Sequence, residues 1–165
     1  MGIGTYRCTV IDVTDLAVGY QFWSAVTGLE IIGKPGGWHG RFGYLGRRDP
    51  WKHEFILQVV DTPKADAANR VHIDLTPNEG MDRAIEQIVA LGGSVKKPPS
   101  LYPRPRSHDD EPPVIDWAVM QDPFGNEFCL VHDLTDEQSQ ASVAAALNGA
   151  TTDQELRAAA GQTHP

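Results

Sequence analysis

A histidine and an aspartate alternate with apolar residues in the segment NRVHIDL, residues 69–75. This period of two is typical of a strand with one apolar and one polar face, so His72 and Asp74 should share a face. An imidazole can bind a metal or exchange a proton near neutral pH, and a neighbouring carboxylate can orient it. The segment therefore offers a candidate catalytic pair, and the alternative is a pair of solvated polar residues on a plain strand.

Length and composition describe one ordinary domain or two small fused modules. The chain has 165 residues, 41% of them hydrophobic and 22% charged, and a net charge of -8. This charge argues against binding to nucleic acid or an anionic membrane, because both need a basic surface. No apolar run approaches the roughly 18 residues of a spanning helix, and the N-terminal segment reads as a strand, not a signal peptide. With two cysteines we expect reduced thiols and a cytoplasmic location.

The first half of the chain predicts one helix among four strands. The helix starts at Thr14 or Asp15, which can cap it, and ends at Gly28. Alternating segments rich in strand formers surround it. The predicted strands cover residues 5–13, 29–33, 41–46 and 52–60.

The second half repeats this order after a polar linker, DTPKADAAN. The opening segment is its first strand, and a helix runs from about Glu79 to Leu91, with Gly92 and Gly93 after it. The remaining predicted strands cover residues 94–97, 117–121 and 127–133.

Two further segments differ from these modules. Residues 98–113 contain six prolines, which predicts a long exposed loop without regular structure. Residues 134–165 predict two alanine-rich helices that form a surface appendage. The pairs Thr135 with Gln138 and Thr152 with Glu155 have the spacing of capping boxes at their starts.

An internal repeat relates the two halves. Cys8 lies 20 residues before Gly28, and His72 lies 20 residues before Gly92, so both pairs are offset by 64. Two copies of one unit would each place a helix on the apolar face of a sheet and leave the other face towards a cleft. By strand parity the cleft side carries His72 and Asp74 from the fifth strand. From the other strands it carries Cys8, Val10, Asp12, Ile56, Gln58, Glu127 and Cys129.

The segments VTDLAVGYQFWSAVTGLEII, RVHIDL and DPFGNEFCLV resemble the vicinal oxygen chelate superfamily, also called the glyoxalase/bleomycin-resistance fold. The resemblance covers residues 4–132 and is greatest to a glyoxalase-like subgroup. It implies an α+β fold in which two paired βαβββ modules form a curved, cleft-bearing mixed sheet. We therefore expect a glyoxalase-like domain at residues 1–133, with modules at 4–60 and 70–132, and a helical tail at 134–165.

The resemblance also implies a metal site built from four positions facing the cleft, on the first, fourth, fifth and eighth strands. Carried over one at a time, these positions fall on Cys8, Gln58, His72 and Cys129. Only His72 matches, because the family often has His at the first position and Glu at the fourth and eighth. Without those carboxylates a standard glyoxalase I metal site is absent, although two sulfurs and an imidazole suit Zn²⁺.

Each of these residues has a simpler interpretation. Buried free cysteines are usually small hydrophobic residues, so Cys8 and Cys129 are either metal ligands or core residues. Gln58 is better suited to contact a ligand through its amide than to bind a metal.

Three further residues are predicted ligand contacts. Trp38 and Trp117 could line a pocket, and the alternative is burial in the core or between subunits. Arg104, with Arg106 and His108 nearby in the proline-rich segment, would suit an anionic or polar substrate, unless this loop is only solvated.

Two functions fit these observations. One is a small-molecule enzyme of lyase, isomerase or ring-modifying type, with His72 and Asp74 as catalytic residues and zinc as the expected ion if a metal is bound. The other is a non-catalytic protein that sequesters a drug or metabolite, as family members in antibiotic resistance do. For either function we expect a homodimer, whose cleft forms within one chain or between two, because the short linker allows both.

Overall fold

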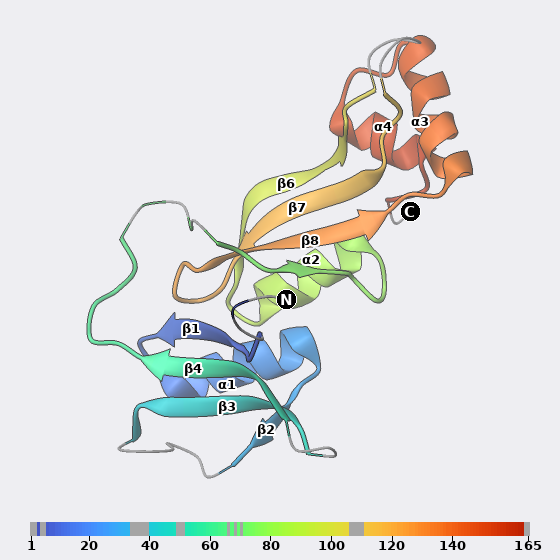
Figure 1. The fold of residues 1–165 in the computed structure, drawn as a ribbon. Coiled ribbons are helices and arrows are strands. Elements are labelled where there is room, and N and C mark those ends of the chain that lie inside the picture. Colours follow the sequence, from blue (N-terminus) through green and yellow to red (C-terminus); the bar gives the residue numbers. More distant parts are fainter. Residues whose placement is uncertain are drawn as a thin grey trace. The chain divides into compact units, whose positions relative to one another are not determined.

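The computed structural model describes residues 3, 6–33, 40–48, 52–65, 67, 69, 71–105 and 111–163 (Figure 1). These residues form the predicted α+β fold, with two four-stranded mixed sheets and four helices. The chain divides into two compact units, consistent with paired modules. Unit one holds residues 1–68 and 122–126, and unit two holds residues 69–121 and 127–165. A cleft between the two modules stays a prediction.

Unit one has the predicted order of one strand, one helix and three strands. Its sheet order is β1-β4-β3-β2, with β1 parallel to β4 and the other neighbours antiparallel. The elements are β1 (Thr9–Val13), α1 (Leu16–Thr27), β2 (Glu30–Ile32), β3 (Phe42–Arg47) and β4 (Lys52–Val59).

The predicted ends of α1 are confirmed. The Asp15 carboxylate accepts a hydrogen bond from the backbone N–H of Val18 at 3.0 Å, and Gly28 adopts the left-handed conformation that ends the helix. On β1, Ile11 and Val13 are buried, and Val10 and Asp12 are exposed. This alternation leaves one face of the sheet packed and the other face open.

The tight turn DPFGN also belongs to unit one, and it is organised by the buried Asp122. Its carboxylate accepts hydrogen bonds from the backbone N–H groups of Phe124 and Asn126, and from the Asn126 amide. The Trp23 indole of α1 donates a fourth hydrogen bond at 3.1 Å. One carboxylate thus satisfies four donors, which explains why this aspartate is buried.

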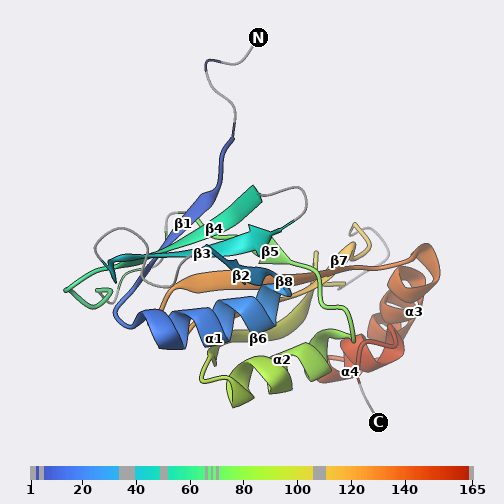
Figure 2. The same cartoon turned by 90° about the horizontal axis from the view of Figure 1, so that it is seen from below.

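Unit two has the same sheet arrangement, β5-β8-β7-β6, with β5 parallel to β8 (Figure 1). Helix α2 packs against β6 and β8, and Figure 2 shows it along one face of the sheet. The core elements are β5 (Asp74–Leu75), α2 (Met81–Ala90), β6 (Ser94–Tyr102), β7 (Ile115–Gln121) and β8 (Glu127–Asp133). Among the described residues, no helix is both long and apolar enough to cross a membrane.

Two predictions about unit two are wrong. Strand β5 has only two residues, so His72 lies just before it, and Val71 is 83% exposed instead of packed. Strand β6 continues through Pro98 and Pro99, where an exposed loop was predicted. It can do so because β6 is an edge strand whose register shifts between Lys97 and Ser100, and edge strands and bulges tolerate proline.

The C-terminal residues form α3 (Asp136–Leu147) and α4 (Asp153–Ala159), and both predicted capping boxes are present. Helix α4 packs into unit two instead of standing clear of it. Leu156 and Ala160 are each 1% exposed and cluster with Leu101 of β6. The tail therefore contributes to the core of this unit.

An arginine of α4 also makes a buried ion-pair network. The Arg157 Nε donates to both carboxylate oxygens of Asp116, at 3.0 and 2.9 Å. Its Nη2 donates to Asp82 at 2.7 Å and to the backbone carbonyl of Gln162 at 2.9 Å. Burial raises the pKa of Asp116, and the Arg157 guanidinium opposes that rise. Since the Arg157 and Asp116 charges are both buried, each compensates the other, and removing one would leave the other unpaired.

Candidate functional site

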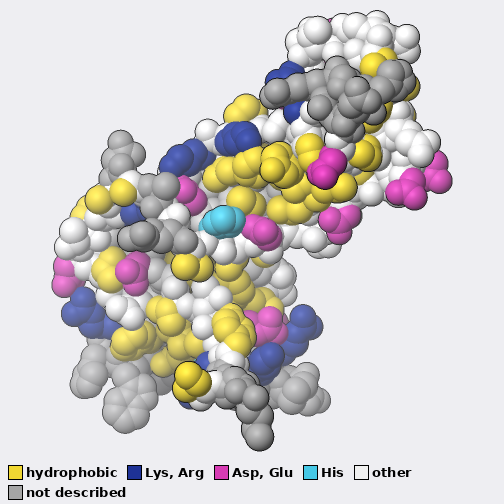
Figure 3. Space-filling model, turned by 45° about the horizontal axis from the view of Figure 1, so that its top comes forward, with side chains coloured by type: hydrophobic (Ala, Val, Ile, Leu, Met, Phe, Trp, Pro, Cys, Tyr) yellow, Lys and Arg dark blue, Asp and Glu magenta, His cyan; other side chains and the backbone are white. Residues whose placement is uncertain are grey.

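The open face of the second sheet, defined here as the face opposite α2, carries the candidate catalytic pair. Along β7, Asp116, Ala118 and Met120 are fully buried on the helix side, so Trp117 and Val119 lie on the open face. Hydrophobic side chains gather over this sheet, with basic side chains at the edge of the patch (Figure 3). The sheet thus has a surface on which a small molecule could lie.

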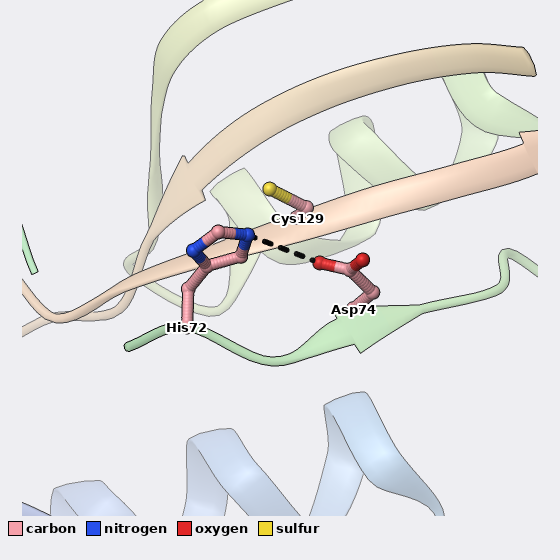
Figure 4. A group of neighbouring side chains, drawn as sticks. All are labelled: His72, Asp74 and Cys129. Atoms are coloured by element: carbon pink, nitrogen blue, oxygen red, sulfur yellow. Dashed lines mark ion pairs between the residues drawn. The ribbon is translucent and has the colours of Figure 1, made fainter. Parts of the chain in front are cut away.

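His72 and Asp74 are neighbours on this open face (Figure 4). The His72 Nε2 lies 3.4 Å from the Asp74 Oδ1, and the two side chains are 52% and 59% exposed. Asp74 is on β5, and His72 precedes it by two residues, so both side chains leave the same side of the chain. The structure therefore places the imidazole beside the carboxylate, and the catalytic role of the pair stays a prediction.

Cys129 on β8 completes a cluster with these two residues. It is the register partner of Asp74, and it is only 5% exposed. One ligand atom from each of His72, Asp74 and Cys129 lies within 4.8 Å of the others. We call these three residues the donor cluster; Figure 4 shows them converging from β5, β8 and the segment before β5.

The Cys129 thiol is held in its neutral form. Burial raises its pKa to about 11, and the charge and hydrogen bond of Asp74 and the charge of Glu127 add to the rise. The Lys97 ammonium acts in the opposite direction. At neutral pH the thiol is therefore a poor nucleophile, and binding a metal there would require it to release a proton.

The chemistry of the donor cluster fits a divalent metal of the zinc type. An imidazole, a carboxylate and a thiol are the ligand types that Zn²⁺ prefers, and three protein ligands would leave a fourth position open. A bound metal would supply a positive charge that favours the thiolate and polarises a ligand oxygen. Within unit two, His72, Asp74 and Cys129 would hold it.

One row of paired residues crosses all four strands of this sheet. Lys97 pairs with Val119, Val119 with Cys129, and Cys129 with Asp74. The Lys97 Nζ lies 3.5 Å from the centroid of the Trp117 ring, in a cation–π contact. Lys97 was not among the predicted site residues, although its position in the predicted strand 94–97 already indicated that it belongs to this sheet.

The predicted ligand contacts are placed in different surroundings. Trp117 is half-buried on the open face, and its Nε1 is a buried donor without an acceptor among the described residues. Arg104 donates to the backbone carbonyl of Thr151 at 2.6 Å and pairs with Asp153, so its contacts are with the C-terminal tail. Trp38, Arg106 and His108 lie outside the described residues.

In unit one, Cys8 is half-buried just before β1, and Gln58 lines a hollow of about 440 Å³.

The strand register identifies the residue of unit one that corresponds to Cys129. Asp74 is opposite Cys129, and the repeat offset of 64 maps Asp74 onto Val10, which is opposite Ile56. Ile56 is therefore the equivalent of Cys129, and Gln58 lies two residues further along β4, opposite Asp12.

The fold and the paired modules define the class of protein. The family model described as Glyoxalase-like domain matches residues 8–131, which include the donor cluster and all strands of both sheets except the last two residues of β8. The chain therefore belongs to the glyoxalase-like domain family, as the resemblance to the vicinal oxygen chelate superfamily implied. No curated protein has significant sequence similarity to it.

Solved structures support the fold at low sequence identity. A genomically encoded fosfomycin resistance protein from Listeria monocytogenes is 20% identical, with a TM-score of 0.55, and the match covers 79% of this chain and 93% of that one. A glyoxalase/bleomycin resistance protein/dioxygenase from Alicyclobacillus acidocaldarius is 13% identical, with a TM-score of 0.54 and the same coverage. A hypothetical protein from S. aureus is 21% identical, with a TM-score of 0.52, over 79% of this chain and 94% of that one. These similarities concern the fold alone.

Proposed function

We propose that this glyoxalase-like protein binds a small molecule on the open face of its second sheet and transforms it with His72 and Asp74. The single observation behind the proposal is the donor cluster, in which three ligand atoms lie within 4.8 Å of one another. His72 would move a proton to or from the ligand, and Asp74 would orient its imidazole. The reaction would be of lyase, isomerase or ring-modifying type, in the cytoplasm, where both thiols stay reduced.

The ligand contacts are part of this proposal. Trp117 would provide an apolar wall on the open face of the second sheet. Gln58 stays a predicted contact and lines a hollow of unit one. Trp38 and Arg104 stay predicted contacts. Arg104 would have to exchange its present partners in the tail for a ligand, because both its hydrogen bond to Thr151 and its ion pair with Asp153 are made there.

A metal, if the protein uses one, would be zinc. The sequence favoured Cys8, His72 and Cys129 as ligands, and the geometry of unit two supports Asp74 beside His72 and Cys129. When bound, the metal would supply Lewis acidity at the open coordination position. With a metal bound, His72 and Asp74 would hold the metal in place of moving the proton, because the metal occupies the imidazole lone pair. The other side chains of the open face would still bind and orient the substrate.

The test is a titration of the chelator-treated protein with Co²⁺, followed by the absorbance of the cobalt–thiolate bond and by proton release. We expect one equivalent to bind, Cys129→Ser to lose the thiolate absorbance, and His72→Ala to weaken binding by about tenfold or more. His72→Ala should keep the folded circular dichroism spectrum, since His72 is half exposed and supports no helix. Unchanged Co²⁺ binding in both variants, or none in the parent protein, would remove the metal from the proposal.

A second candidate, a non-catalytic protein that sequesters its ligand, is favoured by the neutral Cys129 thiol and by Ile56 at the equivalent position of unit one. Neither group can abstract a proton. Tryptophan fluorescence titrations against a metabolite panel, combined with product analysis, separate the two functions. A ligand that is converted supports the enzyme, and a ligand that binds tightly and is recovered unchanged supports sequestration.

A further inference from the structure

Two adjacent lysines of β6 have different surroundings. Lys96 forms an ion pair with Glu127 of β8. Lys97 has no carboxylate partner among the described residues, and its ammonium is held over the Trp117 ring instead. The exposed Lys97 therefore keeps hydrogen-bond donors available for a further partner, whereas Lys96 already has one.

The position of Lys97 relates this free charge to the donor cluster. It begins the row that continues through Val119 and Cys129 to Asp74. Neighbouring strands are about 4.8 Å apart, so the two ends of the row are separated by roughly 14 Å along the sheet. The row thus has a cation at one end, a carboxylate at the other and apolar surface between them.

This polarity determines how a charged ligand would lie. An anionic group is attracted to Lys97 and repelled by Asp74, so it would occupy the β6 end of the open face. The rest of the ligand would then extend over Val119 towards His72.

We propose that Lys97 determines ligand specificity by binding the anionic oxygens of a small carboxylate or phosphonate whose apolar part lies on the open face. This inference rests on the proposed function, because it names the ligand class of the same face. Lys97 binds the anion and Trp117 holds the ammonium in place. The reacting part of the ligand lies at the donor cluster.

The experiment compares four probes that share one ring: benzoate, phenylphosphonate, neutral benzamide and cationic benzylamine. Binding is measured by isothermal titration calorimetry on the full chain at low ionic strength. We expect the two anions to bind, benzamide to bind about tenfold more weakly or worse, and benzylamine not to bind, since hydrogen bonds to charged groups contribute most. The ratio of benzoate to phenylphosphonate affinity shows which anion the face prefers.

The chain provides a matched control for this test. Lys97→Met keeps most of the length of the side chain and removes its charge, and Lys96→Met makes the same change one residue away. We expect Lys97→Met to weaken benzoate binding by about tenfold or more, and Lys96→Met to change it less than about threefold. Lys97→Arg should restore most of the affinity. Equal losses in both methionine variants, or equal affinity for benzoate and benzamide, would overturn the inference, and so would the absence of saturable binding by any probe.

The proposed chemistry is tested separately in His72→Ala. This variant should still bind benzoate, because its Lys97 and Trp117 are unchanged, although it would lose turnover. Anion binding without any turnover in the parent protein would contradict the enzyme and leave the role of Lys97 standing. Loss of anion binding in Lys97→Met is therefore informative whichever function is correct.

Discussion

At the scale of single residues, Cys129 reports on the electrostatics of the donor cluster. Its pKa of about 11 arises first from burial and then from Asp74 and Glu127. At pH 8 only about a thousandth of the thiol is ionised, and the thiolate is the form that reacts with alkylating reagents. Asp74→Asn removes a negative charge and should lower the Cys129 pKa. We expect iodoacetamide to label Cys129 several-fold faster in Asp74→Asn, with Cys8→Ser in the background so that one thiol is followed.

A lower pKa means more thiolate at pH 8, and each unit of the pKa raises the thiolate fraction about tenfold. Asp133→Asn removes the same charge from the same strand, four residues away from Cys129, and should leave the labelling rate nearly unchanged. Lys97→Met should slow labelling, because the ammonium opposes the rise of the pKa. Equal rates in Asp74→Asn and Asp133→Asn would contradict the cluster geometry.

At the scale of secondary-structure elements, Arg157 attaches α4 to unit two. Arg157→Leu leaves the fully buried Asp116 carboxylate without its charged partner. We expect a loss of about 3–5 kcal/mol in the free energy of unfolding, measured by urea denaturation. Arg83→Leu removes an exposed guanidinium that pairs with Glu79 and Glu86, and it should cost at most about 1 kcal/mol.

A double variant separates charge from packing in the same network. In Arg157→Leu with Asp116→Asn the uncompensated charge is gone, so part of the lost stability should return. If the double variant is as unstable as Arg157→Leu alone, removing the uncompensated charge restores no stability. The network would then stabilise α4 through packing and not through charge.

At the scale of the whole molecule, we predict a homodimer, in keeping with the resemblance stated from the sequence. The described sheets end in β1 and β2 in unit one and in β5 and β6 in unit two, and edge strands are common sites of pairing between chains. Multi-angle light scattering should give twice the 18.0 kDa chain mass at micromolar concentration. A mass equal to one chain across the concentration range would contradict the prediction, and it would also exclude a cleft shared between chains.

Local sequence signals predicted much of the fold correctly. The Asp15 cap and Gly28 of α1, the strand at residues 127–133 and both capping boxes of the tail follow from neighbours within a few residues. The alternation of NRVHIDL predicted that His72 and Asp74 lie on one side of the chain. In the structure the His72 Nε2 lies 3.4 Å from the Asp74 Oδ1. Such features depend on backbone conformation and short-range hydrogen bonds, which the sequence determines by itself.

Which distant residues meet depends on the packing of the whole fold. Prolines 98 and 99 fit into β6 because the strand is at the edge of its sheet, and no local pattern reveals an edge. Arg157 of α4 is buried in direct contact with Asp116 of β7, which lies 41 residues away in the sequence. The row from Lys97 through Cys129 to Asp74 depends on the register of four strands. Since a shift of one residue would turn each side chain to the other face, that register is chosen by the packing of the whole sheet and not by any one segment.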